Sequence, residues 1–511
     1  MKTHTIVMAV CFSFSVLARV LSLYGREDAL PSQASVCPAA EIRVDAGRKV
    51  GVVRALHGVN GGPICYGGLV DVSAQQKALG IPLARIHDAN WPSRDAVDIH
   101  AVFPDFKADA ESPENYRFGP TDDYLKSIAA VGSGIVYRLG ESIEHTPRKH
   151  YVHKPADYEQ WAKVCIGVIR HCNEGWADGL HLDIRHFEIW NEPDLGLQQW
   201  DATPEDYYRL YAVTAKAIKG RFPKVKVGGP ATFNAGHFKG DQFVLPPFLE
   251  RFLDYCRKES APLDFLSWHM YTADPALPAR YSAALRRILD DRGFKTTEIH
   301  LNEWNYTPGK DYWPSVFGHH PERMEKLHEV TGGPAGAAFA ACVLLDIQDA
   351  PLDMANFYTA DHGYFGMFNF YGVPRKTYHA FRAFKALVDH PARVAVDGGK
   401  PGELNAAAGL DAAGRELAII VSNFKSPERQ IELAIRNLPW NGPSKYEVLV
   451  LDQARNLEPV RKEERPAGAF KIVQDLPAPG VMLLYVRPRV VILPPGCPLE
   501  MSSTRFSPRA W

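Results

Sequence analysis

The sequence predicts an α/β protein, in which a (β/α)8 TIM barrel is followed by a C-terminal antiparallel β-sandwich. From about residue 41, short runs of β-branched and aromatic residues alternate with helical stretches, eight times in succession. After about residue 391 the helical period is lost, and Gly, Ala and Asp turns separate alternating runs. The length of 511 residues also exceeds that of one ordinary domain.

The predicted barrel occupies residues 41–390. Its eight expected strands are 52–59, 83–87, 135–139, 187–191, 225–228, 265–269, 299–303 and 354–358. The amphipathic stretches that alternate with them are 158–171, 204–219, 248–258, 282–291 and 333–346, and 378–388 closes the series. Their apolar residues recur at intervals of three and four, as in Trp161, Val164 and Val168, which is the helical period. A repeated strand-then-helix unit indicates parallel strands closed into a barrel.

The predicted sandwich occupies residues 391–488. Its expected strands are 417–423, 431–435, 446–451, 470–473 and 481–486. The short run 41–44 lies early enough in the chain to join this sandwich rather than the barrel. Residues 489–511, with a Pro-Pro-Gly turn and a Ser/Thr/Arg-rich end, predict a disordered tail.

The N-terminal residues 1–24 have the pattern of a signal peptide. Lys2 and His4 precede an apolar run, 6–18, which is shorter than the roughly 20 residues that span a bilayer. We therefore expect a secreted or periplasmic protein with no membrane segment beyond this signal. A membrane anchor or a wrongly assigned start codon is the alternative interpretation.

Composition excludes several classes of partner. The net charge of −1 and a pI near 7 give no electrostatic footprint for nucleic acid or an anionic membrane, so the ligand should be neutral or weakly charged. Eight cysteines are present, but no CxxC or Cys/His spacing suggests zinc. We expect neither a metal nor a cofactor, and the pairing of the cysteines and the oligomeric state stay open.

Two strand-end glutamates carry the chemistry. Glu192 follows Asn191 at the end of the fourth expected strand, before Pro193, and Glu303 ends the seventh. Parallel barrel strands end on one face, so both carboxyl groups should face each other across its mouth. Glycosidases need such a pair, separated by about 5–5.5 Å for retention of configuration or about 6.5–9.5 Å for inversion. Either motif alone could be a carboxylate that caps the next helix, and the sequence leaves the separation open.

Three segments resemble motifs of glycoside hydrolase family 39, which contains β-xylosidases and α-L-iduronidases. Residues 188–195, Glu-Ile-Trp-Asn-Glu-Pro-Asp-Leu, resemble the acid/base motif of that family, and Trp200 follows them. Residues 265–271 resemble its sixth-strand motif, and residues 302–305 resemble its nucleophile motif. The resemblance covers roughly residues 50–390 and the trailing sandwich; it is strongest in the two glutamate motifs and loose in the N-terminal third.

The resemblance implies a role for each residue of the pair. Glu192 would be the acid/base, Glu303 the nucleophile, and the configuration would be retained. Asn191 would donate to the sugar 2-hydroxyl, a contact that strengthens in the transition state. The acid must hold a proton near neutral pH, so we expect burial and the charge of Glu303 to raise the pKa of Glu192.

Seven further residues are candidates for sugar binding. His57, His87 and Arg138 close expected strands one to three, His269 and Tyr271 close strand six, Trp304 begins an aromatic loop (304–313), and Asp361 follows strand eight. Asp361 resembles a substrate-binding acid of the family, and the aromatic loop could stack on a pyranose ring. A structural hydrogen bond, an ion pair or ordinary loop packing is the alternative for each.

The resemblance thus leads us to expect a retaining glycoside hydrolase that cleaves terminal glycosidic bonds of an oligosaccharide or polysaccharide, although exo versus endo action stays open. β-Xylosidase is the first expectation, and the family also includes activity on arabinose- and galactose-containing linkages. α-L-Iduronidase is less favoured, because a uronate needs a cationic partner and Met270-Tyr271 follow His269 without one, although Arg375 and Lys376 could serve. A catalytically silent sugar-binding barrel and a transglycosylase are the alternatives from other classes.

Overall fold

The computed structural model describes residues 39–65, 68–89, 91–144, 146–309 and 321–489. The expected signal peptide, the tail from residue 490 onward, and the aromatic side chains of Tyr312 and Trp313 lie outside the described residues. The barrel and the second sheet fall within one compact unit that begins at Ala39.

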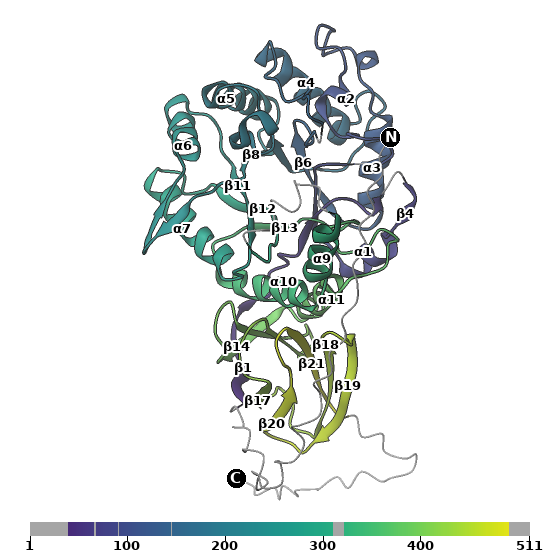
Figure 1. Ribbon diagram of the computed structural model, residues 1–511, viewed down its shortest axis with the longest axis vertical. Helices are drawn as coiled ribbons and strands as arrows, with labels where there is room; N and C mark the ends of the chain where they lie inside the picture. The colour runs from purple at the N-terminus through teal and green to yellow at the C-terminus, as the bar shows by residue number, and fades with distance from the viewer. Residues whose placement is uncertain (1–38, 66–67, 90, 145, 310–320, 490–511) are drawn as a thin grey trace, which may run out of the picture. The chain divides into compact units, whose positions relative to one another are not determined.

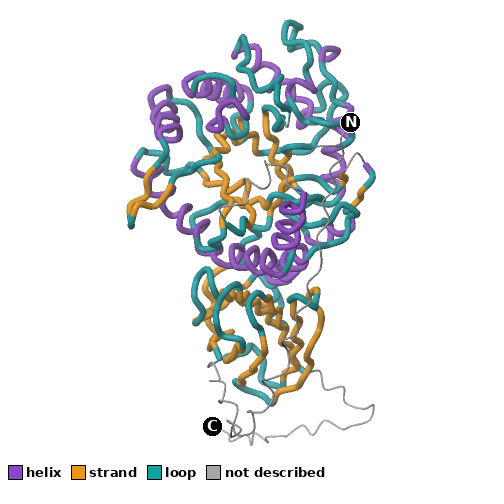
Figure 2. The backbone as a smooth tube through the Cα atoms, viewed as in Figure 1, coloured by secondary structure: helices purple, strands orange, loops and turns teal. Residues whose placement is uncertain are grey.

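Eight parallel strands close into a barrel, which confirms the predicted fold class. Figure 2 shows them as an inner ring of strands with helices outside. Around the barrel the order is β11-β12-β13-β2-β5-β6-β7-β8. These strands are β2 (Gly58–Asn60), β5 (Leu83–Ile86), β6 (Gly134–Leu139), β7 (His186–Ile189), β8 (Lys226–Thr232), β11 (Phe265–Thr272), β12 (Glu298–Tyr306) and β13 (Met354–Phe357). Two short hairpins decorate the loops: β3 (Ile64–Cys65) with β4 (Val70–Asp71), and β9 (His237–Lys239) with β10 (Gln242–Val244).

The start of the barrel differs from the prediction. The expected first strand, 52–59, is wrong, because β1 (Ala40–Val52) belongs to the second sheet and the first barrel strand is β2. The intervening residues are tied down by other contacts: the Val53 amide donates to Pro391 O at 2.9 Å, and the Arg54 amide donates to Gln348 Oε1 at 2.8 Å. The expected barrel boundary at residue 41 is corrected accordingly, and the alternative placement of 41–44 in the sandwich is confirmed.

Helices surround the barrel strands (Figure 1). They are α1 (Ser73–Leu79), α2 (Ile99–Val102), α3 (Gly119–Ala130), α4 (Tyr158–Glu174), α5 (Pro204–Arg221), α6 (Pro247–Glu259), α7 (Leu277–Asp291), α9 (Pro321–Gly332), α10 (Pro334–Asp346) and α11 (Lys376–Val388). Local sequence sets their ends. Helix α5 begins with a capping box in which Thr203 and Asp206 satisfy each other's backbone amides. Helix α4 ends at Gly175, whose φ of 74° suits glycine.

The second sheet has nine strands in the order β19-β18-β21-β16-β15-β14-β1-β17-β20. They are β1 with β14 (Ala392–Asp397), β15 (Leu404–Leu410), β16 (Leu417–Asn423), β17 (Gln430–Arg436), β18 (Ser444–Leu451), β19 (Asn456–Arg465), β20 (Phe470–Asp475) and β21 (Gly480–Pro488). Neighbours pair antiparallel except β1 and β17, which are parallel. The sequence did not predict β19, because this edge strand is mostly charged and shows no apolar alternation.

Helix α10 joins the two cores. It contacts β12 of the barrel and β15, β16 and β21 of the second sheet, and the Ser422 hydroxyl donates to Ala338 O at 2.8 Å. A helix covered on both sides must be apolar all round, which explains its composition. No single helix of the described residues has the length and apolar composition to cross a membrane; α9 and α10 meet that test only as a pair bent by 48°.

Candidate active site

Glu192 is placed by an unusual strand end. After β7, Trp190 and Glu192 adopt positive φ values of 73° and 44°, a conformation that costs energy for residues other than glycine. The Glu192 amide donates to Ala231 O of β8 at 3.0 Å, which fixes the turn. Pro193 then begins a short 3-10 helix, Pro193–Gln198. This tightly held turn directs the Glu192 carboxyl group to the barrel mouth, where its side chain is nearly buried.

Glu303 is placed by a β-bulge. Along the β11–β12 pair, Trp268 lies opposite Leu301 but His269 lies opposite Glu303, so Asn302 is an extra residue in β12. A bulge reorients the side chains around it, and bulges are common beside active sites. Asn302 and Glu303 therefore both contact interior groups although they are adjacent in sequence: Asn302 donates to Glu188 and Glu303 accepts from Arg85.

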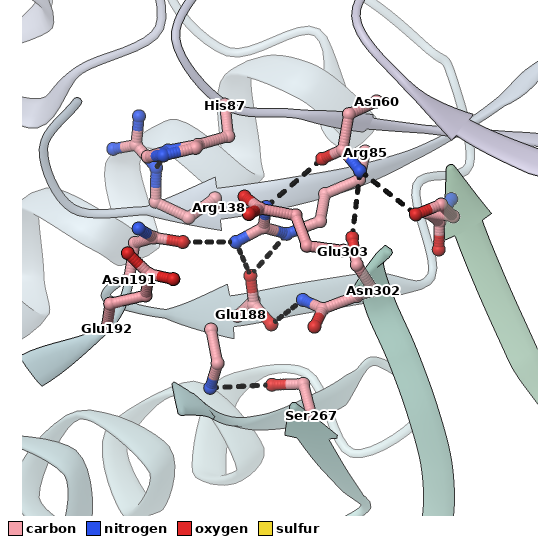
Figure 3. Close-up of polar contacts among 12 residues, drawn as sticks. Asn60, Arg85, His87, Arg138, Glu188, Asn191, Glu192, Ser267, Asn302 and Glu303 are labelled. Atoms are coloured by element: carbon pink, nitrogen blue, oxygen red, sulfur yellow. Dashed lines mark hydrogen bonds and ion pairs between the residues drawn. The ribbon is translucent and has the colours of Figure 1, made fainter. Parts of the chain in front are cut away.

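Arg85 of β5 organises the barrel interior (Figure 3). Its Nη1 donates to Glu303 Oε1 at 2.9 Å, and its Nη2 donates to Asn191 Oδ1 at 2.7 Å. Nε and Nη2 each lie 2.7 Å from Glu188 Oε2, and Nη1 also donates to Asn60 Oδ1 at 3.1 Å. The guanidinium group is fully buried, so these contacts replace its hydration. One arginine thus fixes the nucleophile candidate and the neighbouring amide together.

His269 and Tyr271 of β11 complete the contacts of the two carboxyl groups. His269 Nδ1 lies 2.7 Å from Glu192 Oε1 and 3.3 Å from Glu303 Oε2, and the Tyr271 hydroxyl donates to Glu303 Oε2 at 2.8 Å. A carboxylate oxygen of Glu192 lies within 4.8 Å of one of Glu303. Such close approach of the two carboxyl groups is compatible with the retaining arrangement, in which they lie about 5–5.5 Å apart.

The two carboxyl groups differ in their ability to ionise. Burial raises the pKa of Glu192 well above its ordinary value, and Asp194 adds to the rise. Burial also raises the pKa of Glu303, but His269, Arg85 and the Tyr271 hydroxyl all favour its charged form. Burial lowers the pKa of His269, so the imidazole is neutral between them. Glu192 is therefore suited to hold a proton and Glu303 to carry a charge, and Asp194, rather than Glu303, is the main charge acting on Glu192.

A cavity of 190 Å³ adjoins this pair. Asn60, which binds Arg85, lines it, and so does Phe365, whose ring lies 6.1 Å from that of Tyr271. His87 and Asp361, both expected to bind sugar, also line this cavity. Burial raises the pKa of Asp361 to about 7. The structure thus places His269 and Tyr271 against the glutamates and Asn191 against Arg85, whereas His87 and Asp361 line the neighbouring cavity.

Two expected sugar-binding residues lie elsewhere. The prediction for His57 was wrong, because it precedes β2 and so lies at the opposite end of the strand from the mouth; its Nε2 contacts Leu79 O and Gly80 O at 3.2 and 3.1 Å. The prediction for Trp304 was also wrong. Strand β12 continues past Glu303, so Trp304 points outward and packs on Phe357 and Phe381.

Arg138 has the structural role that was the alternative interpretation. Its Nη2 forms an ion pair with Asp98 Oδ1 at 2.5 Å, and its Nε donates to His87 Nδ1 at 3.2 Å. The side chain is fully buried. Arg138 does not line the cavity itself. It contacts His87, which does, and so orients the imidazole of that residue.

Four residues of the site are not among those predicted from the sequence. Arg85, Asn60, Glu188 and Asn302 form the buried network beneath the glutamates. Arg85 gave one usable signal, since it is a lone charge in the apolar strand Leu-Ala-Arg-Ile. An arginine in an apolar barrel strand needs partners inside the protein, but the sequence does not show which carboxylates these are.

Four groups of His, Cys, Asp or Glu among the described residues could hold a cation, with possible ligand atoms within 4.8 Å of one another. The groups are Cys65, Asp361 and His362; His186, Glu298 and His300; Asp98, His100 and Glu141; and Glu192, His269 and Glu303. In the last group His269 already contacts both glutamates, and Glu303 also accepts from Arg85. The expectation of no metal and no cofactor stays a prediction.

Comparison with known proteins gives a family match. The model of "Glycosyl hydrolases family 39" matches residues 106–455. A curated relative, "Beta-xylosidase" of Caldicellulosiruptor saccharolyticus, is 27% identical over 305 residues; the alignment covers 54% of this chain and 56% of that protein. The chain therefore spans little more than half the length of this relative.

Solved structures are similar over nearly the whole chain. A glucosidase from Croceicoccus marinus is 26% identical with a TM-score of 0.75, covering 89% of this chain and 100% of that one. A monomeric beta-xylosidase from Caulobacter crescentus CB15 is 18% identical with a TM-score of 0.66, covering 88% of this chain and 100% of that one, and supports the fold.

Proposed function

The chain belongs to glycosyl hydrolase family 39, and we propose that it is a retaining glycoside hydrolase with Glu192 as acid/base and Glu303 as nucleophile. The observation that carries the proposal is the separation of at most 4.8 Å between an oxygen of Glu192 and one of Glu303. A retaining enzyme needs this close approach, because Glu303 itself must reach the anomeric carbon while Glu192 reaches the leaving oxygen.

In the first step Glu303 attacks the anomeric carbon, and Glu192 protonates the leaving oxygen. Arg85 and Tyr271 hold the two oxygens of Glu303 in place, so the nucleophile is oriented before the sugar binds. Glu192 uses Oε1 to contact His269, and no hydrogen bond to its Oε2 is found among the described residues. That oxygen is available to give its proton to the leaving group.

In the second step Glu192 accepts a proton from water, which attacks the glycosyl ester on Glu303. Glu192 is ionised after the first step because its proton has left with the leaving group, and esterification has removed the charge of Glu303. Asn191 acts in both steps. Because Arg85 binds its Oδ1, the amide presents Nδ2, which has no partner among the described groups, to the sugar 2-hydroxyl.

A neutral pentose is the substrate that we favour, as in β-xylosidases. Support comes from the "Beta-xylosidase" relative and from the 190 Å³ cavity, whose lining among the described residues includes no lysine or arginine to pair with a uronate. The cations considered for an iduronate bind elsewhere: Arg375 donates to Gly366 O, and Lys376 donates to Asn456 Oδ1. The similarity to a glucosidase supports glucose as a second candidate.

A screen of aryl glycosides tests this proposal. We expect turnover of 4-nitrophenyl β-xyloside to exceed that of the β-glucoside, β-galactoside, α-L-arabinofuranoside and α-L-iduronide. Hydrolysis of the β-glucoside alone would select the second candidate. Binding of xylo-oligosaccharides without turnover of any glycoside would instead indicate the silent sugar-binding barrel.

We further propose that the protein is exported. The apolar run at residues 6–18 after Lys2 supports this, since an extracellular polysaccharide is reached only outside the cytoplasm. Expression of the full chain with cell fractionation and N-terminal sequencing tests it. Export predicts a processed chain outside the cytoplasm, and an intact N-terminus on cytoplasmic protein would contradict it.

A further inference from the structure

A second cavity, of 410 Å³, lies outside the ring of barrel strands. It is formed by the segment after α2, the loop between β6 and α4, the first turn of α4, and Trp190. Its volume falls within the usual range for small-molecule sites, about 300–1,000 Å³. Nothing in the proposed hydrolysis uses this cavity.

The walls of this cavity are largely aromatic. Phe106, Tyr151, Trp161 and Trp190 line it, and Pro104 and Pro155 add rigid apolar surface. The rings of Trp161 and Trp190 lie 6.2 Å apart, and both tryptophans are buried in the core behind the cavity. Such a lining suits a ligand with a flat, apolar ring.

One polar pair lies among these walls. His100 Nδ1 hydrogen-bonds to Glu141 Oε2, and the Tyr151 ring stacks on the imidazole at 3.5 Å with an interplanar angle of 6°. Burial opposes ionisation of His100, but the bond to Glu141 raises its pKa above the ordinary value. While the pair shares a proton between Nδ1 and the carboxyl group, Nε2 carries a hydrogen and acts as a donor.

The unsatisfied polar groups of the lining are mostly donors and cations. Both Glu141 oxygens accept from His100, and Asp157 Oδ1 accepts from the Glu159 and Gln160 amides at 2.9 and 3.1 Å, so Asp157 Oδ2 is the carboxylate oxygen of the lining that faces solvent. By contrast, no carboxylate of the described residues lies within ion-pair distance of the Lys107 ammonium. A ligand that fits these groups carries an acceptor, and an anionic acceptor best of all.

We propose that this cavity binds an aromatic carboxylate, with its ring among Phe106, Tyr151 and the tryptophans and its carboxylate at Lys107 and His100 Nε2. The ring of the ligand is buried against the apolar walls, and its carboxylate pairs with the Lys107 ammonium. The site is separate from the catalytic pair. Neither Glu192 nor Glu303 lines this cavity.

Calorimetry with trans-cinnamate on the full chain tests the proposal, with cinnamyl alcohol as the neutral counterpart. The titration is run at about pH 6, where the carboxylic acid is ionised. We expect cinnamate to bind the wild type about 10-fold or more tightly than the alcohol, a difference that a charge-assisted hydrogen bond supplies. Lys107→Met should abolish that preference, and Ala156→Trp, which fills the cavity from an exposed position, should abolish binding of both compounds.

Lys163→Met provides the matched control. Lys163 is exposed on α4 and does not line the cavity, so the same substitution there should leave cinnamate binding unchanged. Unchanged melting temperatures would show that the variants fold. Failure of cinnamate to bind, or binding that survives Ala156→Trp, would overturn the proposal. Neither result bears on glycosidase activity, which is measured separately.

Discussion

Arg85 donates through Nη1 to Glu303 Oε1 at 2.9 Å, from a position where its guanidinium group is fully buried. The same group binds Glu188 and Asn191, so one cation sets the positions of the nucleophile and of the amide that faces the sugar. Two carboxylates share this cation, and each would be an unpaired buried charge without it.

Replacement of Arg85 should therefore affect folding as well as catalysis. We expect Arg85→Met to destabilise the protein by about 3–5 kcal/mol, because Glu188 and Glu303 lose their buried partner. Urea denaturation measures this. The double variant Arg85→Met/Glu188→Met should lose less than the sum of the two single variants. Arg257→Met, at an exposed position on α6, is the control, and an equal effect there would contradict the account.

Loss of the nucleophile should abolish turnover. Glu303→Gln keeps the size of the side chain but cannot form the glycosyl ester, so kcat/KM for aryl glycosides should fall by roughly 10⁴-fold or more. The control is Glu159→Gln, an exposed position in the first turn of α4. Near-normal activity of the Glu303 variant would contradict the assignment of Glu303 as the nucleophile.

Replacement of the acid/base Glu192 should affect substrates to an extent that depends on their leaving groups. Glu192→Ala should slow glycosides with poor leaving groups by about 10²–10⁴-fold, the usual contribution of general acid catalysis. Activated dinitrophenyl glycosides need little protonation, so their first step should be nearly unaffected. Azide should then restore turnover by replacing the water that Glu192 would activate, with a glycosyl azide as product. Equal losses on both substrates, without azide rescue, would count against this role.

The pH profile should depend on Asp194. Activity requires protonated Glu192, so it is lost as pH rises through the raised pKa of that group. It also requires ionised Glu303, so it is lost as pH falls through a pKa above 4.5. Because Asp194 raises the pKa of Glu192, Asp194→Asn should move the alkaline limb of kcat/KM to lower pH and leave the acidic limb in place. Movement of the acidic limb alone would contradict this assignment.

Trp304 should matter for stability and not for sugar binding. It is buried between β12 and α11, so Trp304→Phe should lower the melting temperature while KM stays within about two-fold of the wild type, since substitutions outside the site rarely change ground-state binding. Tyr271→Phe, which removes a hydrogen bond to Glu303, should change kcat instead. A large rise in KM for Trp304→Phe would restore the original expectation for this residue.

The barrel and its two glutamates could be predicted because they depend on local patterns. Alternation of strands and helices is periodic, and the motifs around Glu192 and Glu303 are contiguous. The direction in which a side chain points was harder to predict than the position of a strand. Strand β12 extends to Tyr306, and this extension turns Trp304 outward, whereas the sequence suggested that the strand ended at Glu303.

The buried network could not be predicted, because its members come from four different strands. Asn60, Arg85, Glu188 and Asn302 meet only after the barrel has closed and the bulge in β12 has added one residue. No spacing in the sequence relates them. The position of His57 was predicted wrongly for a similar reason. The start of β2 depends on where β1, which belongs to the other sheet, ends.

The most direct measurement of the central claim is the anomeric configuration of the first-formed product. Proton NMR of the wild-type enzyme with an aryl β-xyloside resolves the two anomers before they equilibrate. With the glutamate oxygens within 4.8 Å of each other, the β-anomer should appear first and the α-anomer only through mutarotation. Initial formation of the α-anomer would contradict the retaining mechanism and the role assigned to Glu303.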